Sequence, residues 1–222
     1  MIVRDLGLVP YGRAEAIQLA RLAEVVQGAE ETLFLLEHPK VVTMGRHGGD
    51  EHLRVPESAL TALGVEHARS ARGGKITCHF PGQLVAYPIL RLDRRPGGVR
   101  RFVTLLEETA IGLLSRFGIA ARRFEDRPGV WTDSGKIASV GIAVKRWTTW
   151  HGLSLNVAAD TSLFELITLC GLPGVKPASM EGELGRRVDM DEVKHDFGER
   201  FARACGHAFF EDALAHTALA QD

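Results

Sequence analysis

The amino-acid sequence predicts an α+β fold rather than a doubly wound parallel sheet. Apolar residues recur at helical spacing over residues 97–117, which indicates an amphipathic helix. Between residues 129 and 157, short strand patterns follow one another through polar turns, which is typical of antiparallel strands. Other short apolar runs are interspersed with helical patterns, so strands and helices are mixed along the chain.

Composition indicates a soluble globular protein. The 222 residues are enough for one well-buried core, and we expect one domain over residues 1–222. The net charge of −1 gives no global attraction to nucleic acid or to an anionic membrane, although arginines gather over residues 91–101. The amino terminus lacks a secretory signal pattern, and no apolar run approaches the ~20 residues that span a bilayer.

Three widely spaced cysteines are typical of reduced thiols rather than of a disulfide framework. We therefore expect a cytoplasmic protein. None of the three pairs has the spacing of a zinc site, and His47 and His52 lack a third nearby ligand, so we expect no metal. No exposed apolar stripe demands a partner subunit, so we expect a monomer.

The first elements are a helix and two strands. Residues 13–27 have a helical apolar face, and Gly28 follows as a stop signal. Residues 33–36 (LFLL) form a continuous apolar run, which predicts a buried strand. Residues 84–90 predict another strand, in which Pro88 indicates an edge position or a bulge.

The middle of the chain carries the clearest patterns. The helix over 97–117 ends where Gly118 follows it. After it, residues 129–132 lead through Asp-Ser-Gly, a good hairpin turn, into a strand over 136–144. A polar turn returns the chain along 150–157, so we expect a three-strand antiparallel meander.

Two helices are expected toward the carboxyl end. Ser162 and Glu165 have capping-box spacing and predict a short helix over about 163–169. Asp189 opens a final helix, and we assign residues 189–222 to a carboxyl-terminal helical segment.

Cys170 is the cysteine with a position suited to chemistry. It follows the predicted short helix and precedes a glycine, in a segment rich in turn formers, whereas Cys205 and Cys78 lie in patterns that suit core packing. The carboxyl end of a helix disfavours a thiolate, so a nucleophilic Cys170 needs a separate base, for which Lys136, His79 and His151 are candidates. A buried structural thiol remains the alternative.

Lys136 opens a predicted strand and shares its face with apolar side chains. A lysine on that face is partly desolvated, which favours the neutral amine that can exchange a proton with a thiol. The alternative is a solvated lysine after a hairpin turn. The Arg72-Gly73-Gly74-Lys75 loop, which precedes Thr77–His79, allows close approach to a ligand or is a simple hairpin loop, and it matches no nucleotide-binding motif.

Five segments occur in an order that resembles one family. They are LEHP at 36–39, TMGR at 43–46, RGGKITCHFPGQLVAYPI at 72–89, GVWTDSGKIASVGIAVKRWTTWHGLSLNV at 129–157 and LCGLPGVKPASM at 169–180. Together they resemble the lipoyl(octanoyl) transferases over a core of about residues 30–180. The resemblance implies a biotin/lipoate protein ligase-like catalytic domain, with a central mixed, largely antiparallel sheet flanked by helices.

The resemblance also implies the site. Cys170 matches the nucleophile of the family and Lys136 its activating lysine. The acyl-binding segments fall on Arg72, Gly73, Gly74, Lys75, Ile76, Thr77, Cys78, His79, Ser139, Val140, Gly141, Gly152, Leu153 and Ser154. Cys78 and Phe80 stand where the family usually has tyrosine and glycine. The resemblance places both beside the acyl site, where Cys78 adds a second thiol.

The implied activity is the first step of endogenous protein lipoylation. An octanoyl group passes from octanoyl-acyl carrier protein, through a cysteine thioester, to a lysine of a lipoyl domain, without a cofactor. The implied acceptors are lipoyl domains of 2-oxoacid dehydrogenases and the glycine cleavage protein. The alternatives are an ATP-dependent lipoate or biotin ligase, a non-catalytic carrier-binding module, and an amidotransferase between lipoyl-domain proteins.

Overall fold

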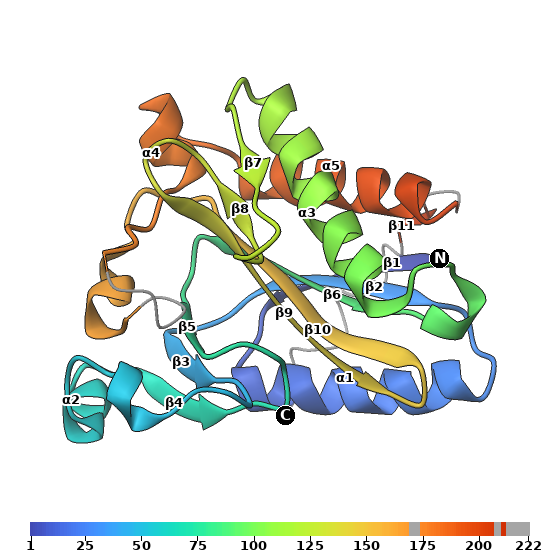
Figure 1. Cartoon of the computed structure of the whole chain (residues 1–222), viewed down its shortest axis with the longest axis horizontal. Helices are drawn as coiled ribbons and strands as arrows, with labels where there is room; N and C mark the ends of the chain where they lie inside the picture. The colour runs from blue at the N-terminus through green and yellow to red at the C-terminus, as the bar shows by residue number, and fades with distance from the viewer. Residues whose placement is uncertain (169–173, 207–209, 212–222) are drawn as a thin grey trace.

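The computed structural model describes residues 1–168, 174–206 and 210–211. Its main sheet has the strand order β11-β1-β2-β6-β10-β9-β8-β7 (Figure 1). Strand β1 runs parallel to β2 and β11, and all other neighbours in this sheet are antiparallel. The strands are β1 (Ile2–Leu8), β2 (Thr32–Glu37), β6 (Gln83–Ile89), β7 (Arg122–Arg123), β8 (Val130–Trp131), β9 (Lys136–Lys145), β10 (Thr148–Asn156) and β11 (Phe210–Glu211).

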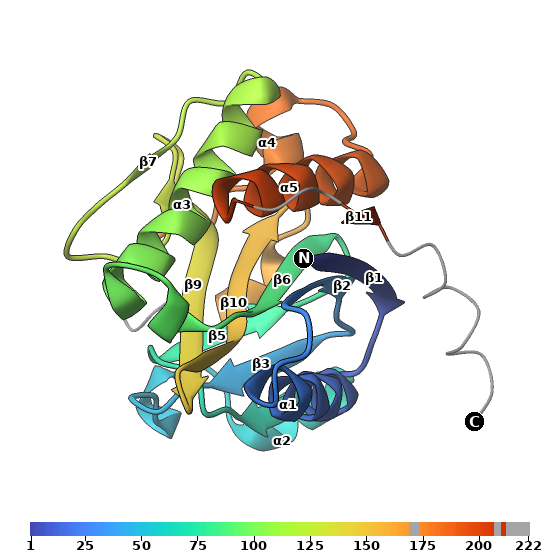
Figure 2. The same ribbon diagram turned by 90° about the vertical axis from the view of Figure 1, so that its right-hand side faces the viewer.

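Helices cover both faces of this sheet. Figure 2 shows α3 (Gly98–Arg116) and α5 (Met190–Ala204) on one face and α1 (Tyr11–Val26) on the other. A small sheet of order β4-β3-β5 lies on the α1 side. The remaining elements are β3 (Val41–Met44), β4 (Glu66–Arg69), β5 (Ile76–His79), α2 (Glu57–Ala62), α4 (Met180–Leu184), and the 3-10 helices η1 (Asp50–His52), η2 (Leu92–Arg94) and η3 (Ser162–Leu166).

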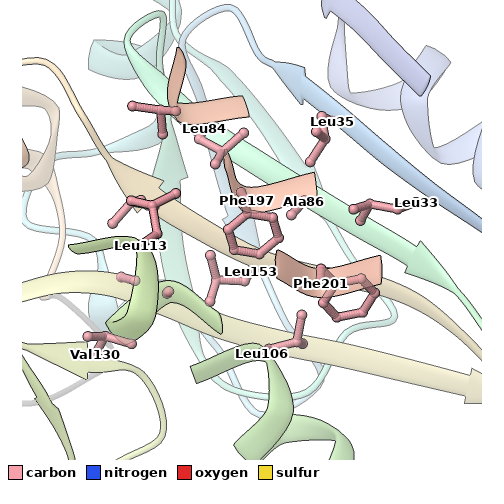
Figure 3. Packing of buried hydrophobic residues seen from close by; sticks show 14 of the residues in the cluster. Leu33, Leu35, Leu84, Ala86, Leu106, Leu113, Val130, Leu153, Phe197 and Phe201 are labelled. Atoms are coloured by element: carbon pink, nitrogen blue, oxygen red, sulfur yellow. The ribbon is translucent and has the colours of Figure 1, made fainter. Parts of the chain in front are cut away.

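Burial on both faces explains why β2 is apolar throughout. Leu33 and Leu35 pack with α3 and α5, whereas Phe34 and Leu36 pack with α1. Figure 3 shows the first of these cores, in which Phe197 and Phe201 of α5 face side chains of β2, β6 and β10. A strand that is covered twice has no solvent face, so its sequence does not alternate.

The structure confirms the predicted α+β class and the mixed, largely antiparallel sheet. The helix expected over 97–117 is α3, and the meander is β8, β9 and β10. The Asp-Ser-Gly turn closes through a hydrogen bond from the Thr132 amide to the Gly135 carbonyl, at 2.9 Å. The strand over 33–36 and the helix over 13–27 are present as β2 and α1.

The edge position that Pro88 indicated is wrong, because β6 lies in the middle of the sheet between β2 and β10. The pairing of β10 with β6 stops at Leu153 and Ala86, so no ladder bond is required of Pro88 on that side. There the Thr149 hydroxyl donates to the Pro88 carbonyl instead, at 2.7 Å. The proline therefore marks a local irregularity between two central strands.

The carboxyl-terminal third differs from the prediction in two places. The short helix is the five-residue 3-10 helix η3, which ends at Leu166 rather than at 169. Its N-cap is Thr161, which makes no side-chain capping bond, and the Ser162 amide donates to the Asp160 carboxylate at 3.0 Å, so the predicted capping box with Ser162 as the cap is wrong. The carboxyl-terminal segment was predicted to be helical over 189–222. The structure shows helix α5 from Met190 to Ala204, with Asp189 as its cap, but Phe210–Glu211 form strand β11, which pairs in parallel with β1.

Among the described helices, none combines the length with the apolar composition that crossing a bilayer requires.

Candidate functional site

A cavity of about 480 Å³ opens between β9, β10, the start of α3 and the loop before β5. Its walls include Lys136 and all of the predicted acyl-binding residues except Cys78. The lining residues from that prediction are Arg72, Gly73, Gly74, Lys75, Ile76, Thr77, His79, Ser139, Val140, Gly141, Gly152, Leu153 and Ser154. Residues from the segments 72–79 and 139–154, which are 60 or more positions apart in the sequence, therefore line the same cavity.

Lys136 is 4% exposed, so it is not the solvated lysine of the alternative interpretation. Its ammonium nitrogen donates to the Pro128 carbonyl at 2.8 Å and lies 5.1 Å from the centre of the Trp131 ring. The carbonyl and the ring face both favour a positive charge. These contacts hold the amine at the cavity wall.

The loop that holds Lys136 is itself held by helix α3. The Gly129 amide donates to Glu107 Oε1 at 2.7 Å, and Glu107 is 3% exposed. Gly129 has φ +125, and a Cβ there would lie 2.6 Å from Lys136 Cε. Only glycine therefore lets this loop approach the lysine so closely.

Arg72 fixes the loop before β5. Its guanidinium is buried and donates to the Thr43 carbonyl at 2.6 Å and to the Thr43 hydroxyl at 2.8 Å. The Gly73 amide donates to the Ile142 carbonyl of β9 at 2.8 Å. The loop is thus tied both to the small sheet and to the main sheet, which makes it a rigid wall rather than a simple hairpin turn.

The sequence interpretation named His151 as a candidate base but missed the aromatic and histidine residues around it. Tyr11, Tyr87 and His151 line the cavity, and His38 lies behind them. The His38 Nδ1–H donates to the Val9 carbonyl at 2.6 Å, and the Tyr87 hydroxyl lies 2.9 Å from His38 Nε2. Because Nδ1 carries the proton of a neutral ring, the Tyr87 hydroxyl donates to Nε2. No local pattern joins these positions, so only the fold reveals the group.

Burial keeps these histidines neutral. It lowers the pKa of His38 to about 4 and that of His151 to about 3, and it lowers the pKa of His79 well below its ordinary value. Burial also raises the pKa of Tyr11 to about 12, so its hydroxyl stays protonated. These tyrosine and histidine side chains are consequently polar but uncharged at neutral pH, and the Arg72 guanidinium beside them carries a positive charge.

Hydrogen bonds also fix which nitrogen of His79 carries the proton. The Asn156 amide donates to the Ala178 carbonyl at 2.8 Å, so Asn156 Oδ1 accepts from Gln83 Nε2, also at 2.8 Å. Gln83 Oε1 is then left to accept from His79 Nδ1 at 2.7 Å. The second nitrogen, Nε2, is therefore an acceptor in the neutral ring.

The same reasoning applies to His151. The Tyr11 hydroxyl and the Arg72 amide both donate to Ser70 Oγ, at 2.7 and 3.3 Å. The Ser70 hydroxyl then donates to His151 Nε2 at 3.3 Å, which leaves the proton on Nδ1. Within the described residues, the His151 Nδ1–H and the Thr77 hydroxyl are buried and have no hydrogen-bond partner. Both His151 and Thr77 line the cavity.

Two predicted features of the site are wrong. Cys78 is fully buried and packs in the core of the small sheet, away from the cavity, so it is not a second thiol at the acyl site. Phe80 lies in the same core, with its ring 5.8 Å from that of Phe164. In β5 the side chains alternate, so Thr77 and His79 line the cavity whereas Cys78 faces the other way.

Cys170 lies outside the described residues, and so does its predicted place at a helix end. The described chain after it runs beside Lys136. The Lys136 amide donates to the Lys176 carbonyl, and the Ala178 amide donates to the Lys136 carbonyl, both at 2.9 Å. The described chain is therefore anchored to the backbone of Lys136 from Lys176 on, a position six residues after Cys170 in the sequence.

Sequence comparison identifies proteins that are similar to this chain over most of its length. The model of the lipoyl protein ligase A/B catalytic domain matches residues 10–202. The octanoyltransferase of Maridesulfovibrio salexigens is 53% identical over 212 residues, which cover 95% of this chain and 97% of that protein. The octanoyltransferase of Nitratidesulfovibrio vulgaris strain DP4 is 54% identical over 208 residues, with 93% and 95% coverage.

Solved structures share the fold at low sequence identity. A lipoate-protein ligase A bound with ATP superposes with a TM-score of 0.77 at 18% identity, covering 96% of this chain and 89% of that one. The biotin protein ligase of Aquifex aeolicus, in complex with biotin and ATP, gives a TM-score of 0.58 at 11% identity, with 92% and 70% coverage. These likenesses confirm the predicted ligase-like architecture.

Proposed function

The chain belongs to the lipoyl protein ligase A/B catalytic-domain family, and we propose that within it the chain is an octanoyltransferase of protein lipoylation. The observation that carries the proposal is the 53–54% identity to octanoyltransferases over almost the whole chain. The cavity supports it, because apolar Val140, Ile142 and Leu153 lie along the same wall as the buried amine of Lys136. An acyl chain and a proton-transfer group both have a place there.

The proposed reaction starts with proton transfer from the Cys170 thiol to the Lys136 amine. The thiolate attacks the carbonyl carbon of the octanoyl thioester, and the bond from that carbon to the carrier sulfur breaks. The carrier thiolate leaves with the proton that Lys136 held. The product of this half-reaction is an octanoyl thioester on Cys170.

The second half-reaction forms an amide. The neutral amine of an acceptor lysine attacks the acyl carbon, the bond to the Cys170 sulfur breaks, and Lys136 carries the amine proton to that sulfur. Because a thioester already carries the acyl group in activated form, the reaction needs no ATP. The buried position of Lys136 supports this role, because an amine shielded from water exchanges protons with its neighbours rather than with solvent.

The proposed donor is octanoyl-acyl carrier protein. The proposed acceptors are lipoyl domains of 2-oxoacid dehydrogenases and of the glycine cleavage protein. We place the enzyme in the cytoplasm as a monomer, where reduced thiols are the norm for a cysteine nucleophile.

Intact-mass measurement tests the proposal. The protein is mixed with octanoyl-acyl carrier protein alone, and we expect one added octanoyl group, which moves to a lipoyl domain when that domain is supplied. The adduct and the transfer should both be lost in Cys170→Ala. Cys205→Ser is the matched control, because Cys205 packs against the core away from the cavity and should not change the adduct.

Two results would contradict the proposal. If Cys170→Ala transfers octanoyl groups at the wild-type rate, the thioester route is wrong. If modification of the lipoyl domain requires free octanoate, ATP and Mg²⁺ together, the chain is a ligase like its structural neighbours rather than a transferase.

A further inference from the structure

We infer that Glu107 is a positioning residue for Lys136, acting through the peptide group between Pro128 and Gly129. The inference deepens the proposed function and rests on it. The carbonyl of this peptide accepts from the Lys136 ammonium at 2.8 Å, and the amide of the same peptide donates to Glu107 Oε1 at 2.7 Å. One peptide group therefore bridges a carboxylate and an ammonium.

A peptide with both of its polar groups engaged is polarised along its own dipole. The carboxylate draws on the N–H, which makes the carbonyl oxygen a stronger acceptor for the ammonium. In a buried site this coupling is weakly screened, and both end groups are almost fully buried. Glu107 thus acts on the amine in two ways, because it fixes the loop in space and favours the charged form of Lys136.

The packing around the bridge leaves the loop little freedom. Gly129 has φ +125, and its peptide lies directly against the lysine side chain. The Trp131 indole N–H donates to the Arg127 carbonyl at 3.2 Å, and the Arg127 guanidinium lies 4.5 Å from the centre of the Phe124 ring. The contact with Glu107 ties the peptide group itself to helix α3, so it fixes where the carbonyl points.

Burial and the neighbouring charges act on Glu107 in opposite directions. Burial raises the pKa of Glu107, whereas the Gly129 amide and the positive charges of Arg123 and Lys136 oppose that rise. Glu108, the next residue, is exposed and forms an ion pair with Arg123 at 2.8 Å. It carries the same charge on the same helix, but it is exposed and bonds Arg123 rather than the Gly129 amide, so it supplies a matched control.

The test uses Glu107→Gln, which keeps an oxygen acceptor for the Gly129 amide but removes the charge. With less stabilisation of the ammonium, the neutral amine forms at lower pH. We expect the acidic limb of the pH–rate profile for octanoyl transfer to move down by about half a unit to one unit. Glu107→Ala removes the acceptor as well and should lower kcat by about tenfold or more with little change in KM. Glu108→Gln should leave both measurements unchanged.

A purely structural role would lower the melting temperature of Glu107→Gln and leave its pH–rate profile unchanged. That result would overturn the inference, as would equal profiles for Glu107→Gln and Glu108→Gln. The rate at which Lys136 is reductively methylated at different pH values, read by mass spectrometry, gives a second measure that needs no transfer. If the wild-type protein does not transfer octanoyl groups at all, the proposed function fails, and the methylation profile alone then decides the role of Glu107.

Discussion

The two ends of the cavity differ in the ionisation of the side chains that line them. At one end, Lys136 carries an amine whose charge is supported by a carbonyl and a ring face. At the other end, Tyr11, His79 and His151 supply polar groups that burial keeps neutral. Six positions of β9 separate Lys136 from Ile142, the partner of His151, which corresponds to roughly 20 Å along the strand. The Arg72 guanidinium also lies at this second end, but it is already bonded to Thr43 and to the Gly73 carbonyl, whereas the amine of Lys136 is a group that can exchange a proton.

This division indicates how one cavity can serve an apolar chain and an ionic step. A charge beside the acyl chain would have to be desolvated whenever the chain enters, which is costly. Neutral side chains that already bond one another avoid most of this cost. The following changes test the division by removing charge at one end, adding it at the other, or filling the space between them.

The largest effect is expected from removing the amine. Lys136→Ala should lower octanoyl transfer at neutral pH by roughly 10²–10⁴-fold, which is the usual contribution of a positioned acid or base. Lys145→Ala is the control, because Lys145 ends the same strand but is exposed and outside the cavity. Steady-state rates with circular dichroism to confirm folding make the measurement. Equal losses in the two variants would show that the buried position of Lys136 has no special role.

The next effect concerns protonation of the histidine end. The pKa of His38 is about 4 and that of His151 about 3 in the folded state, below the ordinary value of 6.5. Between pH 6.5 and 4 the unfolded state therefore binds more protons, so the free energy of unfolding falls as pH falls. Each of these two histidines should lower the free energy of unfolding by about 2 kcal/mol at pH 5 relative to pH 7.

Urea unfolding at pH 7 and pH 5 measures this loss, and His38→Gln should reduce its pH dependence by about one proton. A wild-type free energy of unfolding that is the same at both pH values would show that these histidines are not held neutral.

The contrast between the two ends also separates what the sequence predicts from what it does not. Lys136 was placed on a core-facing strand from alternation alone, because its parity matches that of Ala138, Val140 and Ile142. Its predicted burial is confirmed. The glycine-rich loop at 72–75 was also identified, since paired glycines are a local signal. Features that depend on one strand or one turn are thus accessible from the sequence.

The histidine end depends on long-range contacts, so no local pattern reveals it. Tyr11 comes from α1, His38 follows β2, Tyr87 lies in β6 and His151 in β10. Cys78 is the reverse case. The resemblance predicted it at the site, but in β5 its side chain points away from the cavity and packs in the core of the small sheet. The face that a residue in a short, fully buried strand adopts is decided by its neighbours in space rather than by its own pattern.

A smaller effect is expected from Tyr87→Phe. The substitution removes the hydroxyl that donates to His38 Nε2 at 2.9 Å and leaves a buried acceptor without its partner. The free energy of unfolding should fall by about 1–3 kcal/mol, while the rate of octanoyl transfer per folded molecule changes little. Chemical denaturation beside a transfer assay separates the two readouts. A large loss of rate with unchanged stability would place Tyr87 in the chemistry instead.

The smallest effect concerns the space between the two ends, where Val140 lines the wall. Val140→Phe should displace part of a bound acyl chain, and each methylene that loses its contacts costs about 0.8 kcal/mol, or about fourfold in rate. The ratio of kcat/KM for octanoyl to heptanoyl donors should therefore fall by about this factor. Val144→Phe is the matched control, because Val144 lies four residues further along the same strand, on the same face, and is 37% exposed and outside the cavity. If both variants keep the wild-type ratio, the acyl chain does not pass Val140, and the histidine end of the cavity has another use.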